Sequence, residues 1–510
     1  MTAPGTPVSP PSVSLTASGA RYTGLAGAVL LAVAGYLGGA LPDAPLGGTP
    51  VSIWRAPDGP ATLTCWLIGT ALLVGAWWSL RSGAPSTRWA YVTAGLWALP
   101  LLVAPPLGSR DVYSYACQGW TYAHGVDPYT VGVAAAGCPW LDTVAPIWRD
   151  TPAPYGPAFM LLAALAVGLG GGLTGTIVAL RVIAVAGLLL AALCLPGLAR
   201  AAGVPTRQAA WLALAGPLVG VHLVAGAHND AVMLGLLLSG LLVVVRRPGR
   251  PAALLLAGAL LGLAVTVKAS AVVVVPFAVL AGMPGPYTLR ALLRHCGWLA
   301  GGLLAALVVT SAVSGLGFGW VGGLTHSGDS EQWTSPPTAV GFVVDYAGAL
   351  VGRDPQAVPG VRAVALLLLV GVLTVLWWRA WQTLRQWNEV AGSGAAHVGA
   401  SSGVASLGVD CHQVTRSRVA LHGAALALVA TVVLSPVFHP WYATWPLALL
   451  ALTAARTTWF VLPAAAAAFL ALPDGTNLAR VTKAPGALAM TALLLTVLVR
   501  TPFAARRRHR

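Results

Sequence analysis

Long apolar runs recur along almost the whole chain, and this repetition restricts the fold more than any other feature of the sequence. A helix that crosses the hydrocarbon core of a bilayer, roughly 30 Å thick, needs about 20 mostly apolar residues. Only 8% of the residues are charged, whereas soluble domains carry about 25%. We therefore expect an all-α polytopic membrane protein.

The apolar runs predict about 13–14 transmembrane helices, several of them short. The expected spans lie near residues 22–41, 62–81, 89–106, 176–199, 207–225, 229–246, 251–267, 269–283, 292–315, 361–381, 418–437, 441–455, 457–472 and 485–500. Together they form one membrane domain over residues 22–500.

Basic residues in the short loops predict the orientation of these spans, because Lys and Arg prefer the cytoplasmic side. One set of loops and the C-terminus holds the basic groups at 81 and 88, 200 and 207, 246–250, 290 and 294, 379 and 385, 416 and 418, and 506–510. Both termini are then cytoplasmic, in a protein of the plasma membrane. The apolar stretch 156–172 would invert every later loop if it crossed, so we expect a half-helix or re-entrant segment there.

The same scheme predicts two large outer loops, at 107–155 and 316–360. A Gly-, Ala- and Ser-rich stretch at 386–417 is expected to be a flexible cytoplasmic linker, residues 1–21 a disordered cytoplasmic tail, and 501–510 a basic cytoplasmic tail. Of the 14 acidic residues, only Glu389 and Asp410 fall on the cytoplasmic side. This distribution indicates a polar site that faces outward.

Several function classes can be set aside. The net charge of +15 comes mostly from loop residues that set orientation, so nucleic-acid binding is not expected. GxGxxG patterns at 170–175 and 317–322 follow no βαβ strand, and no Walker A sequence is present, which argues against direct use of a soluble nucleotide or nucleotide-sugar. The cysteines lack metal-ligand spacing, and no carboxylates cluster, so no metal site is expected, although a divalent metal is not excluded. Cys117 and Cys138 share an outer loop and could form a disulfide.

The first outer loop concentrates acidic and aromatic residues. Asp111 directly follows a span and opens a helix that also carries Tyr113 and, one turn on, Tyr115. Asp127 with Tyr129, and later Tyr155 in a Pro-rich segment, extend this loop as a rigid platform for a carbohydrate. The alternative is an aromatic belt at the membrane interface.

A second group of polar residues lies at the outer ends of the spans. His228, Asn229 and Asp230 begin one span, where Asp230 either serves function or caps the helix. Lys268 lies in an outer hairpin, against the usual preference of Lys for the inside, and therefore needs an anionic partner. A functional phosphate, a lipid head group or Asp230 could provide it, and Arg181 is a second candidate cation.

The Pro-broken turn 435–442 contributes the last candidates. His439 can donate a hydrogen bond to a phosphate oxygen or transfer a proton. Trp441 and Tyr442 add aromatic faces for a sugar. A turn that merely breaks a helix needs none of these roles.

The ordered set of motifs at 110–115, 125–129, 151–157, 227–230, 335–338 and 435–442 resembles the polyprenol-phosphomannose-dependent α-1,6-mannosyltransferases of actinobacteria. These enzymes belong to the GT-C class of membrane glycosyltransferases, and the similarity covers about residues 89–455. The resemblance implies a GT-C-type helix bundle, a mannose donor carried on polyprenyl phosphate, and a mannan or lipoglycan acceptor outside the membrane. No other cofactor is implied.

The resemblance also implies roles. Asp111 matches the acidic residue that acts as the catalytic base, and the donor phosphate is held by basic residues near the outer interface, a role compatible with Lys268, His439 and Arg181. One carboxylate suffices because polyprenyl phosphate leaves as a stabilised anion and needs no acid. Attack by the acceptor 6-hydroxyl would invert the anomeric centre to give an α-1,6 linkage.

Two other readings stay open at this stage. A GT-C enzyme that uses another lipid-linked sugar, such as an arabinosyl unit, would share these motifs. A transporter or flippase would also have many spans, but its polar groups are expected near the membrane midplane, whereas here they lie in outer loops and at outer helix ends.

Overall fold

The computed structural model describes residues 15–397 and 405–507, and its regular secondary structure in that part of the chain is entirely helical. The longer helices are α1 (Ala17–Gly38), α3 (Gly59–Ser79), α4 (Thr87–Val103), α7 (Leu173–Ala201), α9 (Asp230–Arg246), α10 (Pro251–Val267), α12 (Leu289–Ser314), α15 (Ala357–His397), α16 (Ala405–Leu434) and α20 (Lys483–Arg507).

Short helices fill the connections between them. They are α2 (Pro50–Trp54), α5 (Asp111–Ala123), η1 (Leu141–Thr143), η2 (Pro146–Trp148), α6 (Pro157–Gly170), α8 (Thr206–Leu214), η3 (Val219–Ala225), η4 (Ala269–Val274), α11 (Val275–Gly282), α13 (Trp320–Gly323), η5 (Leu324–Gly328), α14 (Pro336–Leu350), η6 (Pro440–Ala443), α17 (Thr444–Leu450), α18 (Thr458–Ala467) and α19 (Leu478–Val481).

The expectation of an all-α polytopic membrane protein is confirmed, but the expected count of spans is not reached. Within the described residues, seven helices are long and apolar enough to cross a membrane: α1, α3, α7, α12, α15, α16 and α20. The pair α8 and η3, bent by 65°, raises this to eight if it forms one broken span. The other expected spans are helical but have at most 17 residues each. One of them, α10, covers the expected range 251–267 and ends at Lys268, whose backbone is extended.

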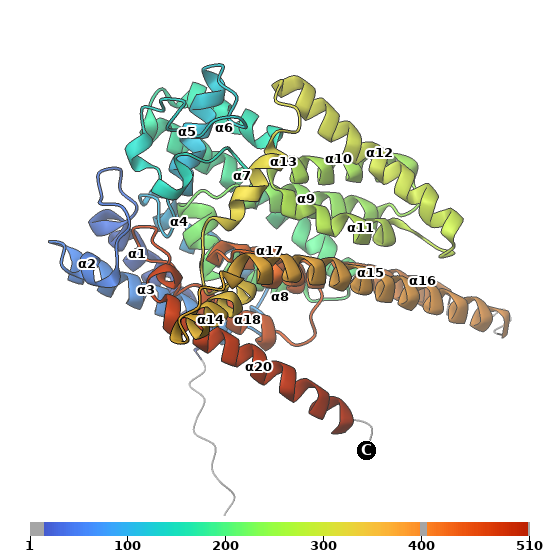
Figure 1. Ribbon diagram of the computed structural model, residues 1–510. Helices are drawn as coiled ribbons and strands as arrows, with labels where there is room; N and C mark the ends of the chain where they lie inside the picture. The colour runs from blue at the N-terminus through green and yellow to red at the C-terminus, as the bar shows by residue number, and fades with distance from the viewer. Residues whose placement is uncertain (1–14, 398–404, 508–510) are drawn as a thin grey trace, which may run out of the picture.

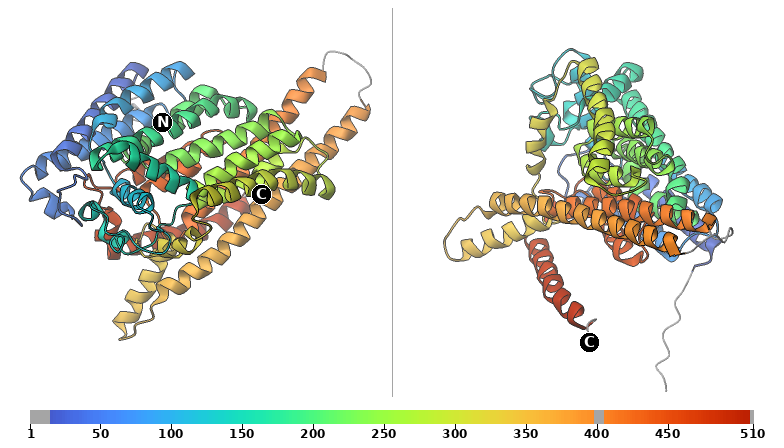
Figure 2. Two further views of the ribbon diagram at one scale, coloured as in Figure 1. Left: turned by 90° about the horizontal axis from the view of Figure 1, so that it is seen from above. Right: turned by 90° about the vertical axis from the view of Figure 1, so that its right-hand side faces the viewer.

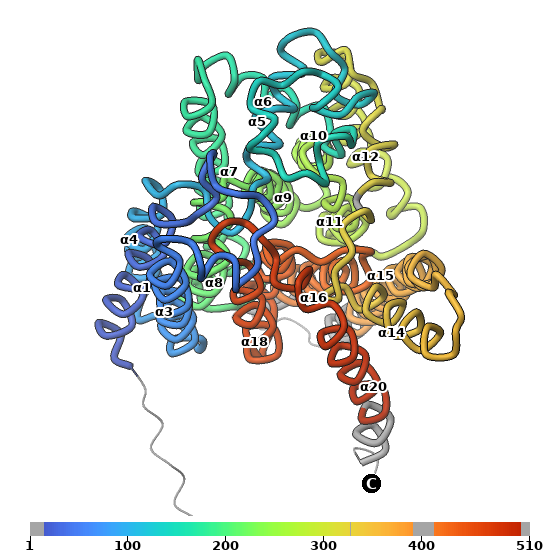
Figure 3. The backbone as a smooth tube through the Cα atoms, turned by 60° about the vertical axis from the view of Figure 1, so that its left-hand side comes forward, coloured from blue at the N-terminus to red at the C-terminus, as the bar shows by residue number. Residues whose placement is uncertain are grey.

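The helices between α1 and α12 form two main groups (Figure 1). α1, α3 and α4 pack together on one side, and α7, α9, α10 and α12 pack in sequence beside them. α15 and α16 lie side by side along the body, and α20 packs against α14 and projects away from the rest (Figure 2). α5 and α6 cover one end of the α7–α12 group (Figure 3).

Glycines allow α7 and α9 to approach closely. A Cβ at Gly187 would lie 2.5 Å from the Cα of Val232, and a Cβ at Gly235 would collide with the carbonyl oxygen of Gly187. Small residues at such crossings are typical of membrane helix pairs, whose association depends on packing. The contact fixes the position of α9, whose first residue is Asp230.

Three expectations about segments can be compared with the helices. The stretch 156–172 contains α6, whose 14 residues extend about 21 Å. This length is shorter than the roughly 30 Å of a hydrocarbon core, as expected for a half-helix. The expected flexible linker at 386–417 is instead helical up to His397 and again from Ala405, because its Ala-rich sequence favours helix. The expected tail 1–21 ends earlier, since α1 begins at Ala17, and α20 continues to Arg507; residues 1–14, 398–404 and 508–510 lie outside the described part.

Gly187→Val is expected to destabilise the protein, because its side chain must push α9 away from α7; overpacking costs typically about 1–3 kcal/mol. Gly297→Val in α12 is the matched control, since a Cβ at Gly297 meets no atom within 4 Å. Thermal unfolding of the detergent-purified variants checks this. Equal melting temperatures for the two variants would contradict the close contact.

Candidate functional site

Arg110 joins three separate loops at the start of α5. Its buried guanidinium donates hydrogen bonds to the backbone carbonyls of Leu41 (3.0 Å), Ala44 (3.2 Å), Thr143 (3.3 Å) and Asp474 (3.3 Å). A guanidinium has five N–H donors in a rigid plane, which suits it to several fixed acceptors at once. The side chain therefore holds the N-terminus of α5 in place.

α5 directs a polar stripe into the interior. The backbone N–H of Asp111 donates to the Ser109 hydroxyl at 3.1 Å, and the helix begins at Asp111. A disulfide between Cys117 and Cys138 links α5 to the loop that follows it. The sequence had indicated this pairing as possible, because both cysteines lie in the same expected outer loop. Asp111, Ser114 and Gln118 share one helix face, because they are three and four residues apart.

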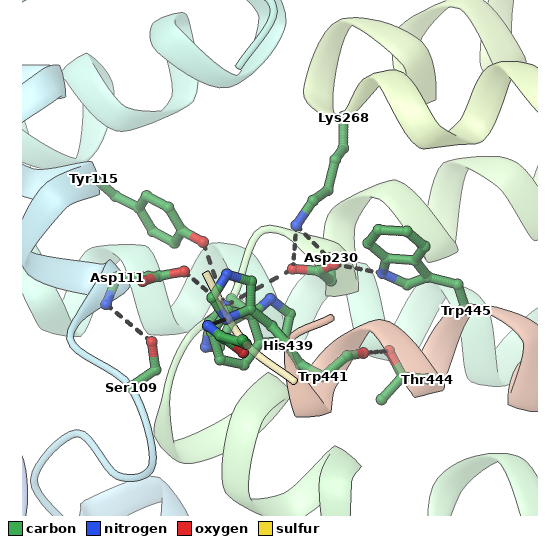
Figure 4. A network of polar contacts seen from close by, with 11 residues as sticks. Ser109, Asp111, Tyr115, Asp230, Lys268, His439, Trp441, Thr444 and Trp445 are labelled. Atoms are coloured by element: carbon green, nitrogen blue, oxygen red, sulfur yellow. Dashed lines mark hydrogen bonds and ion pairs between the residues drawn. The ribbon is translucent and has the colours of Figure 1, made fainter. Parts of the chain in front are cut away.

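The centre of the site is a buried ion pair between Asp230 and Lys268 (Figure 4). The Lys268 ammonium donates to both carboxylate oxygens of Asp230 at 2.9 Å, and the Trp445 indole N–H donates to one of them at 2.5 Å. Asp230 is completely buried, and the side chain of Lys268 is 12% exposed. An ammonium has three donors, so Lys268 retains one for a ligand.

His228 lies between the two acidic residues. Its Nδ1 is 3.3 Å from the Tyr115 hydroxyl, 3.7 Å from a carboxylate oxygen of Asp111 and 3.8 Å from one of Asp230. The ring packs against Trp441, with centroids 4.1 Å apart. His228 thus connects Asp111, on α5, to the Asp230–Lys268 pair.

Aromatic rings surround the ammonium of Lys268. Its Nζ lies 5.1 Å from the ring centroid of Tyr442, 5.3 Å from that of Trp445 and 5.9 Å from that of Tyr155. Ring faces attract a cation through their quadrupole, and the attraction grows when water is excluded. The rings therefore help to keep a charged lysine in this position.

Two cavities meet at this site. The larger has a volume of about 440 Å³ and the smaller about 180 Å³. Both are lined by Asp111, Trp148, His439 and Trp441. Among the residues that line only the larger cavity are Asp329, Glu331, Gln332, Asp474, Asn477, Arg480 and Lys483; among those that line only the smaller are Ser114, Gln118, Tyr155, Lys268, Ser270, Tyr442 and Trp445.

Burial shifts the pKa values of two residues at the junction. It raises the pKa of Asp111 to about 6, although the Lys268 ammonium and the Ser109 hydroxyl oppose the rise. It also lowers the pKa of His439 to about 3, with a further contribution from Lys268. At neutral pH Asp111 is a carboxylate of unusually high basicity, and His439 is a neutral imidazole that stacks on Trp441 at 4.5 Å.

Most of the residues singled out in the sequence converge here. Those in the network or on the cavity walls are Asp111, Tyr115, Tyr155, His228, Asp230, Lys268, His439, Trp441 and Tyr442. Asp230 has its carboxylate occupied by Lys268 and Trp445, so it positions the lysine rather than contacting a substrate.

The other expected site residues lie elsewhere or have other partners. The hydroxyl of Tyr113 donates to the carbonyl of Ala40, and Asp127 accepts from the backbone N–H of Tyr129 in a turn, so none of these three side chains lines the two cavities. Asn229 is buried beside the network and also lines neither cavity.

Arg181 is not placed to bind a donor phosphate. Its guanidinium donates to the carbonyls of Leu102, Ala104 and Ala225 at 2.7–2.8 Å. These carbonyls lie at the ends of α4 and η3, where helical hydrogen bonding stops. Arg181 therefore stabilises the two helix ends.

Sequence reasoning missed several wall residues. Trp445 stands one turn after Tyr442, and Ser114 and Gln118 follow Asp111 at helical spacing, so periodicity could have found them. The loop 471–477 gave no such signal, because its place beside Arg110 depends on the tertiary fold.

Among the described residues, no group of three or more His, Cys, Asp or Glu side chains could hold a metal ion.

Comparison with known proteins decides the family. Residues 21–284 match the family model described as alpha-(1->6)-mannopyranosyltransferase, N-terminal domain, and residues 397–500 match the MptB C-terminal domain. The chain belongs to the alpha-(1->6)-mannopyranosyltransferase family. It is accordingly a membrane glycosyltransferase, as the sequence motifs indicated.

Relatives in this family match most of the chain. An alpha-(1->6)-mannopyranosyltransferase of Mycobacterium tuberculosis is 30% identical, over 86% of this chain and 78% of the relative. Alpha-(1->6)-mannopyranosyltransferase A of the same organism is 30% identical over 85% and 80%, and alpha-(1->6)-mannopyranosyltransferase B of Corynebacterium glutamicum is 27% identical over 89% and 78%. No solved structure matches the chain.

Asp230→Asn is expected to lower the melting temperature of this family member, because it leaves the largely buried Lys268 ammonium without a carboxylate. Removing one partner of a buried pair costs about 3–5 kcal/mol. The double variant Asp230→Asn, Lys268→Met removes both charges and should melt higher than Asp230→Asn alone. Identical melting temperatures for the single and double variants would show that the pair contributes little.

Proposed function

We propose that this chain transfers mannose from polyprenyl phosphomannose to a mannan or lipoglycan acceptor on the outer face of the plasma membrane, forming an α-1,6 linkage with inversion. The observation that carries the proposal is the position of Asp111. Its carboxylate lies where the two cavities meet, with Lys268 on the wall of the smaller one. A transferase needs this arrangement, because two substrates must meet at one base.

The smaller cavity suits the donor. Lys268 lines it and keeps one N–H for a phosphate oxygen, and the neutral His439 at the junction can donate a second hydrogen bond. Tyr155, Trp441 and Tyr442 offer ring faces to the sugar.

The larger cavity suits the acceptor. Its wall carries carboxylates, amides and the basic side chains of Arg480 and Lys483, which together offer donors and acceptors to a polyhydroxyl chain. Its greater volume leaves room for more than one sugar unit. An acceptor that lies there presents its terminal hydroxyl to Asp111 at the junction.

The reaction balances with these groups alone. Asp111 accepts the proton of the acceptor 6-hydroxyl as the oxygen attacks the anomeric carbon, and the bond from that carbon to the phosphate oxygen breaks. The departing phosphate gains one negative charge while Asp111 loses one. Lys268 and His439 face the oxygen that gains the charge, where fixed donors stabilise a transition state most effectively.

Two features support the outer face as the location of the site. Asp111, Asp230, Lys268 and His439 come from four segments that the loop charges assigned independently to the outer side, and they converge at one end of the helices. The Cys117–Cys138 disulfide lies in the same expected outer loop. Disulfides persist in oxidising environments outside the cytoplasm.

The test is an assay of purified protein with polyprenyl phosphomannose and an α-1,6-mannoside acceptor, followed by linkage analysis of the product. Asp111→Asn is expected to reduce transfer about 10²- to 10⁴-fold, the range typical of general acid–base groups. Asp142→Asn, which changes a fully exposed carboxylate in the same loop, is the matched control. Transfer of another lipid-linked sugar in place of mannose, or near-normal activity of Asp111→Asn, would refute the proposal.

The raised pKa of Asp111 predicts a pH dependence. The base must be ionised, so kcat/KM should fall as the pH drops through about 6, where Asp111 takes up a proton. Ser109→Ala removes a hydroxyl that lowers the pKa of Asp111, so its profile should shift to higher pH. If the fall of kcat/KM at low pH occurs at the same pH in Ser109→Ala as in wild type, the titrating group is not Asp111.

A further inference from the structure

Three polar side chains that line the smaller cavity but not the larger one lack hydrogen-bond partners. The hydroxyl oxygens of Ser114 and Ser270 and the amide oxygen of Gln118 are buried, and none has a partner among the described residues. Buried polar atoms in folded proteins are nearly always paired, and an unpaired one lowers stability. Three such atoms on one cavity indicate a ligand that pairs with them.

The chemistry of these atoms restricts that ligand. An amide oxygen only accepts, whereas a serine hydroxyl both donates and accepts, so the complement is a group of hydroxyls. A polyprenyl chain or an aromatic ring offers no such groups. The ring faces of Tyr155 and Tyr442 on the same wall suit the apolar C–H faces of a sugar.

The positions along α5 place the sugar relative to the reacting atoms. Ser114 and Gln118 follow Asp111 by three and seven residues on one face, which corresponds to about 5 and 10 Å along the helix axis. Ser270 comes from η4, two residues after Lys268. A sugar whose anomeric carbon lies between Asp111 and the Lys268-bound phosphate therefore extends along this polar stripe.

We infer that Ser114, Gln118 and Ser270 recognise the hydroxyls of the transferred sugar and so determine which lipid-linked sugar the enzyme accepts. Gln118, which lies farther from Asp111 along α5 than Ser114 does, pairs with a hydroxyl on the side of the ring opposite the anomeric carbon. The inference rests on the proposed function, because it takes the smaller cavity as the donor site. It adds the residues that select the sugar.

Gln118→Leu tests the inference with a series of polyprenyl phosphate donors that carry mannose, 3-deoxymannose or 4-deoxymannose. For wild type, kcat/KM is expected to be at least about tenfold higher with the mannose donor than with one of the two deoxymannose donors. A site built to hydrogen-bond a hydroxyl disfavours a substrate that lacks it. Gln118→Leu should lose about tenfold in kcat/KM with mannose and lose that discrimination. Equal losses with every donor, or discrimination that persists unchanged, would overturn the role of Gln118.

Melting temperature without donor provides a second measurement that does not depend on activity. Because Gln118→Leu and Ser114→Ala remove unpaired polar atoms, both should melt at or above the wild-type temperature while using the donor less well. A purely structural role predicts a lower melting temperature, and that result would overturn the inference.

Thr70→Val is the matched control, since Thr70 in α3 also has a buried unpaired hydroxyl but lines neither cavity. It should melt at or above wild type and keep full discrimination among donors. The wild-type arm separates the two proposals. Transfer of mannose with unchanged discrimination in Gln118→Leu overturns only the inference, whereas no mannose transfer by wild type overturns the proposed function and the inference together.

Discussion

The site depends on the pairing of Asp230 with Lys268. A lone charge in an apolar helix bundle carries a large desolvation penalty, and the mutual contact at 2.9 Å offsets it on both sides. The pair joins the start of α9 to the end of α10, and Trp445 joins α17 to the same carboxylate. The ammonium of Lys268 is thereby held in one orientation at a cavity wall. An exposed lysine on the surface would change its conformation freely in water.

The other determinants arrange acidic and aromatic groups around this cation. Gly187 and Gly235 bring α9 against α7. Arg110 and the Cys117–Cys138 disulfide hold the two parts of α5, so that Asp111 lies beside His228. Each constraint comes from a different stretch of the chain, and together they leave Asp111 at the junction of two cavities. The geometry of a transferase follows from contacts that individually serve stability.

The sequence indicated which polar residues lie close together better than it indicated the lengths of the helices. The sequence indicated four site residues because burying a charged or titratable group beside apolar helices costs free energy, so such groups usually serve a function. These residues are Asp111, Asp230, Lys268 and His439. Hydropathy alone does not separate a crossing helix from a short buried one. The sequence therefore predicts spans at η4 with α11 and at α17, although η4 is a 3₁₀ helix that begins after Lys268 and α17 follows the short helix η6. Arg181 and Tyr113 carried the right chemistry, but their backbone partners are set by tertiary contacts that no local pattern contains.

Under the proposed function, the sharing of Asp111 by both cavities restricts how a polymer can grow. After each transfer the new terminal unit occupies the place where the next donor sugar must bind. The product must therefore withdraw by one residue into the larger cavity, or leave altogether, before another lipid-linked sugar can enter. Chain length is then governed by the relative rates of sliding and release, and the affinity of the larger cavity for sugars controls that ratio.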